Sequence, residues 1–242
     1  MKFNNRLSLL FLLIAVMTFR SWSESLQWTE YSSLPPASGN AERIPFAGAY
    51  AGVSNGALII AGGAHRAAGN PFEKARLLDD IFVLPLSNAQ SPDSGALELL
   101  PHEWYSGFHL NSPLAFGASA STDQGLVCLG GWNGTRIVAE AFLLTWDAER
   151  RTVHKTDLPS LPVPSRNCVA AAIGSDVYVA ALEQETSAAH FWRLDLEHRQ
   201  SGWQELPACP SQADQIIAAS QHNGENDCFY LICQNLANSN AD

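Results

Sequence analysis

Residues 49–65 read AYAGVSNGALIIAGGAH, an apolar run that rises through Leu58 and Ile60 and stops at paired glycines. A strand that ends in Gly-Gly lets another backbone pass close by, because neither residue carries a Cβ atom. When such a pattern recurs at a fixed interval, it indicates a repeat architecture.

The pattern does recur. Related stretches are GLVCLGGWNG at 125–134, DVYVAALEQE at 176–185 and CFYLICQNL at 228–236. Successive glycine-pair positions lie about 50 residues apart, which is the spacing of kelch-type propeller blades. The first interval is longer because polar insertions at 65–78 and 87–96 extend it.

Each unit holds four strand-like segments in the same order, and no stretch keeps a helical period. A small-residue strand such as AYAGVS or CVAAAI comes first, followed by the strand that ends at the glycines and then by DDIFVLPL, EAFLLTWD or HFWRLDL. The fourth is clear in TVHKTDLPSLP and GWQELPACP and weaker in LELLPHEW at 97–104. The sequence predicts an all-β, kelch-type β-propeller of four-stranded antiparallel blades, with strands a to d running outward from the axis.

The order of the segments predicts an incomplete ring. A d-type strand around Trp28 precedes the first a strand, and Asp242 follows soon after a b-type strand. About three and a half blades are therefore expected within the kelch-type period. Open blade edges expose unpaired strands, through which the protein could self-associate.

The N-terminus predicts export. Lys2 and Arg6 precede an apolar run over 7–19, and Ser21 and Ser23 are small residues suited to a signal peptidase. We expect a signal peptide at 1–23 and one partial propeller domain at 24–242, periplasmic or secreted. The apolar run is too short for a membrane span, and no later segment is long enough.

Composition excludes several partner classes. The chain has 242 residues, 46% hydrophobic and 16% charged, with a formal net charge of −10. An acidic protein is a poor match for nucleic acids or anionic membranes, which basic patches bind. The five cysteines form no CxxC pair, so metal binding is not expected. Their disulfide pairing is open; a Cys228–Cys233 bridge would require the two residues to face each other.

The stretches FAGAYAGVSNGALIIAGGAH and DDIFVL resemble the bacterial sialic acid mutarotase family (N-acetylneuraminate epimerase), in its cyclically permuted branch. PLAFGASASTDQGLVCLGG and VYVAALEQETSAAHFWRLDLEHRQSGWQELPACP resemble successive blades, so the resemblance covers about residues 28–233. It implies a periplasmic kelch propeller of about six blades that interconverts the anomers of N-acetylneuraminate. Arg166 matches an arginine typical of the family, whereas Leu114 and Ala213 stand where other members carry one. The family's proposed catalytic glutamate would lie beyond Asp242.

The candidate site follows from blade geometry. Connections from d to a and from b to c emerge at the same end of a propeller, the usual place for a ligand. The polar residues on them are Arg43, His65, Arg66, Asn70, His109, Asn111, Trp132, Asn133, Arg136, Arg166, Glu183 and Glu185.

Mutarotation needs a proton-transfer group and a cation for the substrate carboxylate. We assign Glu183 or His65 to proton transfer, and Arg166, with Arg136 second, to the carboxylate; Asn133 and Trp132 complete the expected substrate site. Each also has a structural reading: Arg166 as a loop residue, His65 as a loop-bracing histidine, Glu183 as a substitute in a degenerate glycine pair, and Trp132 as a filler between blades.

Three functions remain open on the sequence. The first is an exported sialic acid mutarotase that acts without a metal or organic cofactor, and the second is a non-catalytic kelch module that binds glycan or protein. The third is an inactive truncated propeller. An arginine and a carboxylate that converge on the channel would favour the first.

Overall fold

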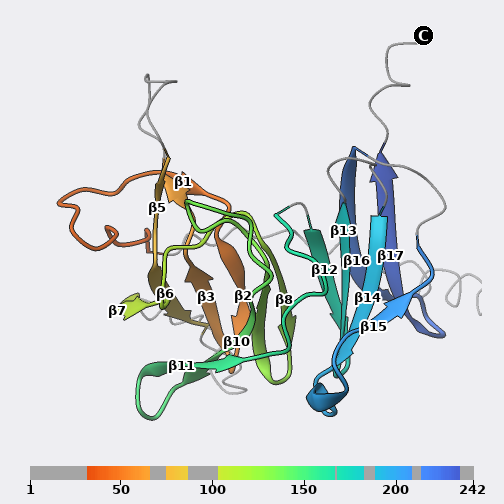
Figure 1. Ribbon diagram of the computed structural model, residues 1–242. Coiled ribbons are helices and arrows are strands. Elements are labelled where there is room, and N and C mark those ends of the chain that lie inside the picture. The colour runs from red at the N-terminus through yellow and green to blue at the C-terminus, as the bar shows by residue number, and fades with distance from the viewer. Residues whose placement is uncertain are drawn as a thin grey trace, which may run out of the picture. The chain divides into compact units, whose positions relative to one another are not determined.

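The computed structural model describes residues 32–65, 75–86, 103–166, 168–182, 189–208 and 214–234. These residues form antiparallel sheets joined by turns, with a single 3-10 turn at Arg199–Ser201 as their helical element (Figure 1). Three sheets have four strands, which confirms the predicted all-β fold of four-stranded antiparallel blades. We name these sheets blades A, B and C in chain order.

The strand order in each blade follows the chain. Blade A holds β2 (Tyr50–Ser54), β3 (Ala57–Ala61), β6 (Asp80–Pro85) and β7 (Tyr105–His109). Blade B holds β8 (Ala118–Thr122), β9 (Gly125–Leu129), β10 (Ala141–Asp147) and β11 (Thr152–Asp157). Blade C holds β12 (Cys168–Ile173), β13 (Asp176–Leu182), β14 (Ala189–Asp195) and β15 (Gln204–Leu206).

Two smaller sheets accompany the blades. The last two described strands, β16 (Gln215–His222) and β17 (Asp227–Gln234), form an antiparallel ribbon. A second small sheet joins β1 (Phe46–Ala47), β4 (Ala64–His65) and β5 (Arg76–Leu77). The sequence did not predict this sheet, because strands of two residues are too short to show a period.

The inner strands lie next to one another in chain order, as they do around a propeller axis. β2 contacts β8, β8 contacts β12, and β12 contacts β16. Hydroxyl groups of β8 link the first pair: Ser121 Oγ accepts a hydrogen bond from the Val53 amide at 2.8 Å, and Ser119 Oγ accepts one from Ala51 at 3.2 Å. Small side chains allow this close approach.

Side-chain alternation along blade B divides the core into two clusters. Leu126 and Phe142 point into a cluster shared with blade A, whereas Val127 and Leu143 point into one shared with blade C. Blade B is therefore buried on both faces, which explains why β9 is a continuous apolar run.

The other face of blade A is covered by the segment that precedes it. Phe82 and Leu78 form a third cluster with Ala37, packed against Leu34 and neighbouring residues of 32–46. This segment takes the place that a further blade would occupy on that face.

The paired glycines bind the connection that leads to the next blade. In blade A, the Gly63 amide donates to the carbonyl of Leu114 at 2.8 Å. In blade B, the Gly131 amide donates to the carbonyl of Ser165 at 2.7 Å. The same hydrogen bond therefore recurs in successive blades and fixes the end of each b strand to the following d-to-a connection.

Glycine is required there for steric reasons. A Cβ atom on Gly62 would lie 2.3 Å from the Leu114 carbonyl oxygen, and one on Gly130 would lie 2.3 Å from that of Ser165. Both glycines also have positive φ angles, 66° and 63°. The close backbone passage inferred from the Gly-Gly ending is confirmed.

One predicted strand differs in the structure, and other predictions concern residues that the structure does not describe. The fourth strand of blade A is Tyr105–His109 rather than LELLPHEW at 97–104, and His109 consequently ends a strand instead of lying on a connection. The proposed signal peptide and Trp28 lie outside the described residues. Among the residues that are described, no helix is long and apolar enough to cross a membrane.

Cys128, Cys168 and Cys228 are free cysteines. Cys228 and Cys233 are five positions apart on one strand, so their side chains point to opposite faces about 17 Å apart along it. A disulfide needs Cα atoms within about 7 Å. A bridge between them is therefore excluded, and Cys128 is buried in the first core cluster.

Candidate functional site

The predicted ligand face lies where the glycine pairs meet the d-to-a connections. The Ser165 amide donates to the carbonyl of Val138 at 3.2 Å, in addition to the bond between Ser165 and Gly131. These bonds hold the loop that carries Arg136 against the loop that carries Arg166. A Cβ atom on Gly134 would lie 3.5 Å from Leu77, so the sheet that contains His65 neighbours the same loop.

His65 is half-buried on β4, with Phe46 and Arg76 as its cross-strand neighbours. Its Nδ1 lies 2.6 Å from the carbonyl oxygen of Pro45. A carbonyl can only accept, so the neutral imidazole carries its proton on Nδ1 and leaves Nε2 as an acceptor. His65 is thus braced by a loop and keeps one nitrogen able to take up a proton.

Three arginines at this end have no partner among the residues that the structure describes. Arg43, Arg136 and Arg166 are exposed, and none forms a hydrogen bond or ion pair through its guanidinium group with a described residue. The other described arginines, including Arg76 at this same end, are engaged by acidic, amide or carbonyl oxygens or by an aromatic ring: Arg76, Arg150, Arg151, Arg193 and Arg199. The positive charge left for an anionic ligand is therefore concentrated at the glycine-pair end.

Asn133 and Trp132 shape the loop that carries Arg136. The Asn133 Oδ1 accepts hydrogen bonds from the amides of Thr135 and Arg136, both at 3.0 Å, which leaves its amide NH2 for other partners. Trp132 is half-buried and exchanges backbone hydrogen bonds with Ala115. Both residues have a structural role in addition to the binding role assigned from the sequence.

On the connection that leads into blade B, Leu114 does not correspond to Arg166, which lies on the connection into blade C. Leu114 matches Ser165, because both offer their carbonyl oxygen to the second glycine of a pair. Its side chain is buried, with 2% of its surface exposed. The connection in blade B is one residue longer, with Phe116 at a φ angle of 63°. Either Ala115 or Phe116 then corresponds to Arg166, and neither carries a charge.

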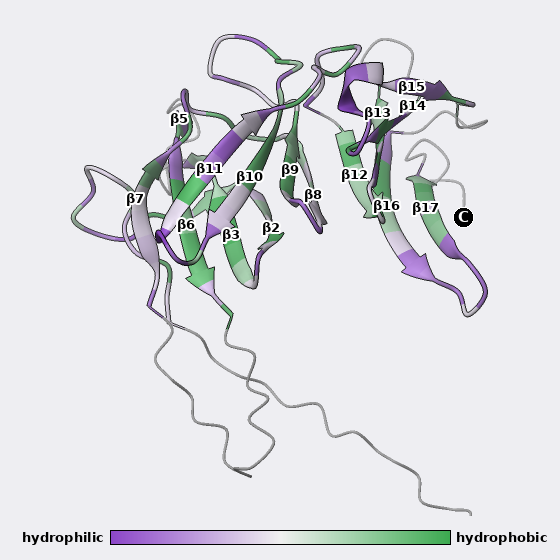
Figure 2. Cartoon of the chain, turned by 90° about the horizontal axis from the view of Figure 1, so that it is seen from below, coloured by the Kyte–Doolittle hydropathy of each residue, from purple (hydrophilic) through white to green (hydrophobic). Residues whose placement is uncertain are grey.

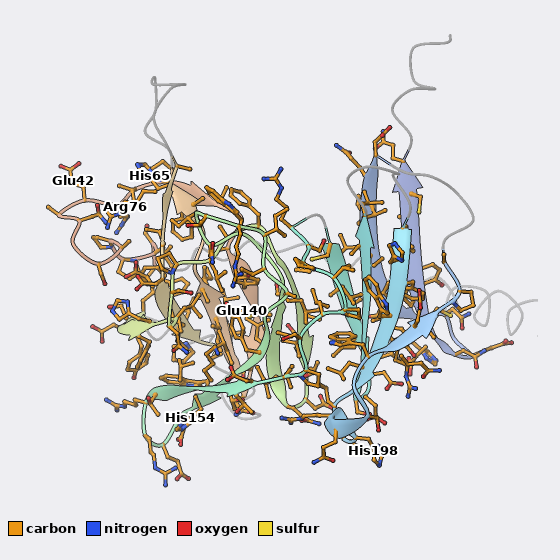
Figure 3. The ribbon with its side chains drawn as sticks, in the orientation of Figure 1. Glu42, His65, Arg76, Glu140, His154 and His198 are labelled. Atoms are coloured by element: carbon orange, nitrogen blue, oxygen red, sulfur yellow. The ribbon has the colours of Figure 1, made fainter. Side chains whose placement is uncertain are left out.

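Several predicted residues lie outside the described part of the chain: Arg66, Asn70, Glu183, Glu185 and Ala213. Sequence patterns missed two polar residues near His65. Figure 3 shows Glu42 and Arg76 at the same corner as His65, with His154 and His198 at the opposite end. The Arg76 guanidinium donates to Asn40 Oδ1 at 3.0 Å, whereas Glu42 is an exposed carboxylate that no motif marked.

A hollow of about 550 Å³ lies at the other end of the inner strands. Turns between a and b strands line it, and Asp123 is the ionisable residue among those lining groups. A carboxylate ligand would meet negative charge there. The glycine-pair end, with three arginines that have no described partner, is the better candidate for an anionic ligand.

A group of acidic residues and a histidine follows β14. Ligand atoms of Asp195, Glu197 and His198 lie within 4.8 Å of one another. Asp195 accepts hydrogen bonds from the amides of the other two residues and lies 2.8 Å from His198 Nδ1. The group is an exposed turn stabilised by its own hydrogen bonds, and it makes no case for a metal.

We predict that His198 titrates above its usual range. Its hydrogen bond to Asp195 raises the pKa of the imidazole from the ordinary 6.5. Because the folded-state pKa is raised, the small stabilising effect is complete below pH 6.5 and is lost as the pH rises through the folded pKa. An NMR titration of the histidine ring should show the shift, and Asp195→Asn should lower the pKa. An unchanged pKa in that variant would contradict the assignment.

Comparison with known proteins places these features in a family context. No family model matches the chain. The N-acetylneuraminate epimerase of Brucella melitensis is 30% identical over 139 residues, which cover 52% of this chain and 32% of that protein. That of Vibrio vulnificus is 33% identical over 124 residues, 50% of this chain and 30% of that protein. The chain is a distant relative of the N-acetylneuraminate epimerases.

The epimerase from Salmonella arizonae gives a similar result, with 27% identity over 111 residues. The resemblance expected from AGVSNGALIIAGGA is thereby confirmed, although it covers about half of the chain rather than residues 28–233. The chain spans about a third of the length of these epimerases, in agreement with a partial member.

Proposed function

We propose that this chain is an exported kelch-type propeller protein that promotes the anomeric interconversion of N-acetylneuraminate. The observation that carries the proposal is the set of three exposed arginines at the glycine-pair end, Arg43, Arg136 and Arg166, for which the described part of the chain provides no partner. An arginine fork binds both oxygens of a carboxylate, the group that distinguishes a sialic acid from neutral sugars. The names of the epimerase relatives support the same substrate class.

In the proposed reaction, Arg166 holds the carboxylate. Arg136 lies on the neighbouring loop, which is hydrogen-bonded to the loop that carries Arg166. The Nε2 atom of His65, or the carboxylate of Glu183, removes the proton from the anomeric hydroxyl group as the ring opens. The bond between the anomeric carbon and the ring oxygen breaks, and the ring oxygen takes up a proton to become a hydroxyl group. This hydroxyl group then attacks the other face of the ketone and gives up its proton, while the carbonyl oxygen is protonated to form the new anomeric hydroxyl group. The oxidation state of the sugar does not change, so the proposed reaction needs no redox cofactor.

The second candidate is a module that binds sialic acid or a sialylated glycan without catalysis. It is favoured by the uncharged counterpart of Arg166 in blade B, Ala115 or Phe116, since a site with fewer cations fixes the orientation of the substrate less well for catalysis, while Arg166 can still bind the carboxylate. Such a module would use the same end of the blades.

One experiment separates the candidates. Freshly dissolved α-N-acetylneuraminate is followed by proton NMR to its anomeric equilibrium, with and without the purified protein. Ligand titration is measured in parallel with the methyl glycoside, which cannot mutarotate. Acceleration supports the mutarotase, whereas binding of the glycoside without acceleration supports the binding module. A folded protein that neither accelerates nor binds would overturn both.

A further inference from the structure

Tyr50 is a buried titratable residue beside the candidate site that the proposed reaction does not use. It is the first residue of β2 in blade A, and none of its surface is exposed. Its hydroxyl group donates a hydrogen bond to the carbonyl oxygen of Gly130 at 2.5 Å. Gly130 belongs to the glycine pair of blade B, 80 residues further along the chain. Tyr50 therefore links the inner strand of one blade to the glycine pair of the next.

The phenol fills a space that two glycines leave open. A Cβ atom on Gly117 would lie 2.5 Å from the Tyr50 Cε1 atom, and one on Gly131 would lie 2.5 Å from its hydroxyl oxygen. The ring packs edge-on against Phe142, with 5.9 Å between the ring centroids. Figure 2 shows that β9, the strand that leads to Gly130, is hydrophobic along its length. Burial raises the pKa of Tyr50 above its ordinary value of 10.0, so the phenol keeps its proton for this hydrogen bond.

Further hydrogen bonds lead from this contact to the arginines of the candidate site. Next to Gly130, the Gly131 amide donates to the Ser165 carbonyl at 2.7 Å, which holds the connection that carries Arg166. The Gly131 carbonyl accepts a hydrogen bond at 2.9 Å that closes the loop of residues 131–138, on which the second candidate arginine lies. A shift of Gly130 would therefore move both segments that carry these arginines.

The Tyr50 contact is not part of the blade repeat, unlike the bond between each glycine pair and the next connection. Ala118 and Cys168 begin the inner strands of blades B and C, and neither carries a phenol. We propose that Tyr50 is a positioning residue, whose hydroxyl group fixes the 131–138 loop and the Arg166 connection in the arrangement that binds an anionic sugar. This inference rests on the proposed function and deepens it.

Tyr50→Phe tests the proposal, because it removes the hydroxyl group and keeps the ring. The arginines hold a carboxylate that takes no part in the bond changes, so KM should rise about three- to tenfold while kcat stays close to the wild-type value. If the protein only binds, the dissociation constant of the methyl glycoside should rise by the same factor. Amide hydrogen exchange followed by NMR should become faster in the 131–138 loop.

Ser54→Ala is the matched control, because Ser54 lies at the other end of the same strand. Its buried Oγ atom accepts a hydrogen bond from the Trp146 amide of blade B at 3.1 Å. This variant also loses one buried hydrogen bond between blades A and B, so urea unfolding should show a comparable loss of stability. KM, the dissociation constant and hydrogen exchange in the 131–138 loop should stay at their wild-type values.

The proposal is overturned if Tyr50→Phe keeps the wild-type affinity for the sugar or loses no more affinity than Ser54→Ala. A wild-type protein that neither accelerates nor binds would overturn the proposed function instead, and hydrogen exchange in the two variants would then decide whether Tyr50 fixes the loop. Should Tyr50→Phe fail to fold, exchange in the wild type replaces it. A Gly131 amide that exchanges as fast as exposed loop amides would then contradict the proposal, and a protected one would support it.

Discussion

Gly130→Ala is expected to cost about 3–5 kcal/mol of folding stability. The left-handed backbone at this residue, with a φ angle of 63°, already disfavours a side chain by about 1–2 kcal/mol. The added methyl group would lie 2.3 Å from the Ser165 carbonyl oxygen, so the connection must move away. That movement breaks the hydrogen bond from Gly131 and leaves buried polar groups unpaired, at about 1–3 kcal/mol.

Gly174→Ala is the matched control. Gly174 has a φ angle of 57°, and no atom lies within 4 Å of the added Cβ position. It should cost only the backbone term of about 1–2 kcal/mol. Urea unfolding followed by tryptophan fluorescence gives both values from the midpoint and slope. Equal losses in the two variants would show that the close passage at Ser165 does not stabilise the fold.

Arg166→Ala is expected to lower catalytic efficiency toward N-acetylneuraminate by about 10- to 100-fold. Hydrogen bonds to a charged group contribute about 1.5–3 kcal/mol, and 1.4 kcal/mol corresponds to a factor of ten. The carboxylate takes no part in the bond changes, so the loss should appear mainly in KM. Initial anomerisation rates at several substrate concentrations separate KM from kcat.

Two variants sharpen this test. Arg166→Lys keeps the charge but not the planar fork and should recover only part of the efficiency. Arg150→Ala is the control, because Arg150 pairs with Asp147 at 2.9 Å on the turn after β10. It should behave as the wild type. If Arg166→Ala keeps full efficiency, another cation such as Arg43 must hold the substrate, or the mutarotase proposal is wrong.

The inner strands could be predicted because their local signals agree with their surroundings. Asn55 and Gly56 mark a two-residue turn, and both have positive φ angles, 46° and 71°. The strand from Ala57 to Ala61 is apolar because it lies between two packed clusters. The outer strand Tyr105–His109 shows no such signal, since it is partly exposed and contains a glycine.

The site was harder to predict because it depends on which charges find partners. Arg76 and Arg166 both lie on connections, yet Arg76 is bound by Asn40 and the carbonyl of Ser38, far away in the sequence. The Nδ1 partner of His65 is a backbone carbonyl, which no side-chain motif identifies. Residue type and spacing group the candidate residues at one end of the blades, whereas three-dimensional contacts distinguish arginines that have described partners from arginines that have none.

The bond between each glycine pair and a later connection also sets an order for folding during synthesis. Gly63 cannot form its hydrogen bond until Leu114 has left the ribosome, and Gly131 must wait for Ser165. Each blade can therefore pair its own strands before its end is fixed to the next blade. A nascent chain that pauses after a glycine pair but before the connection that it binds would carry a complete sheet. The end of this sheet would not yet be hydrogen-bonded to the next connection and would be accessible to proteases and chaperones until translation resumes.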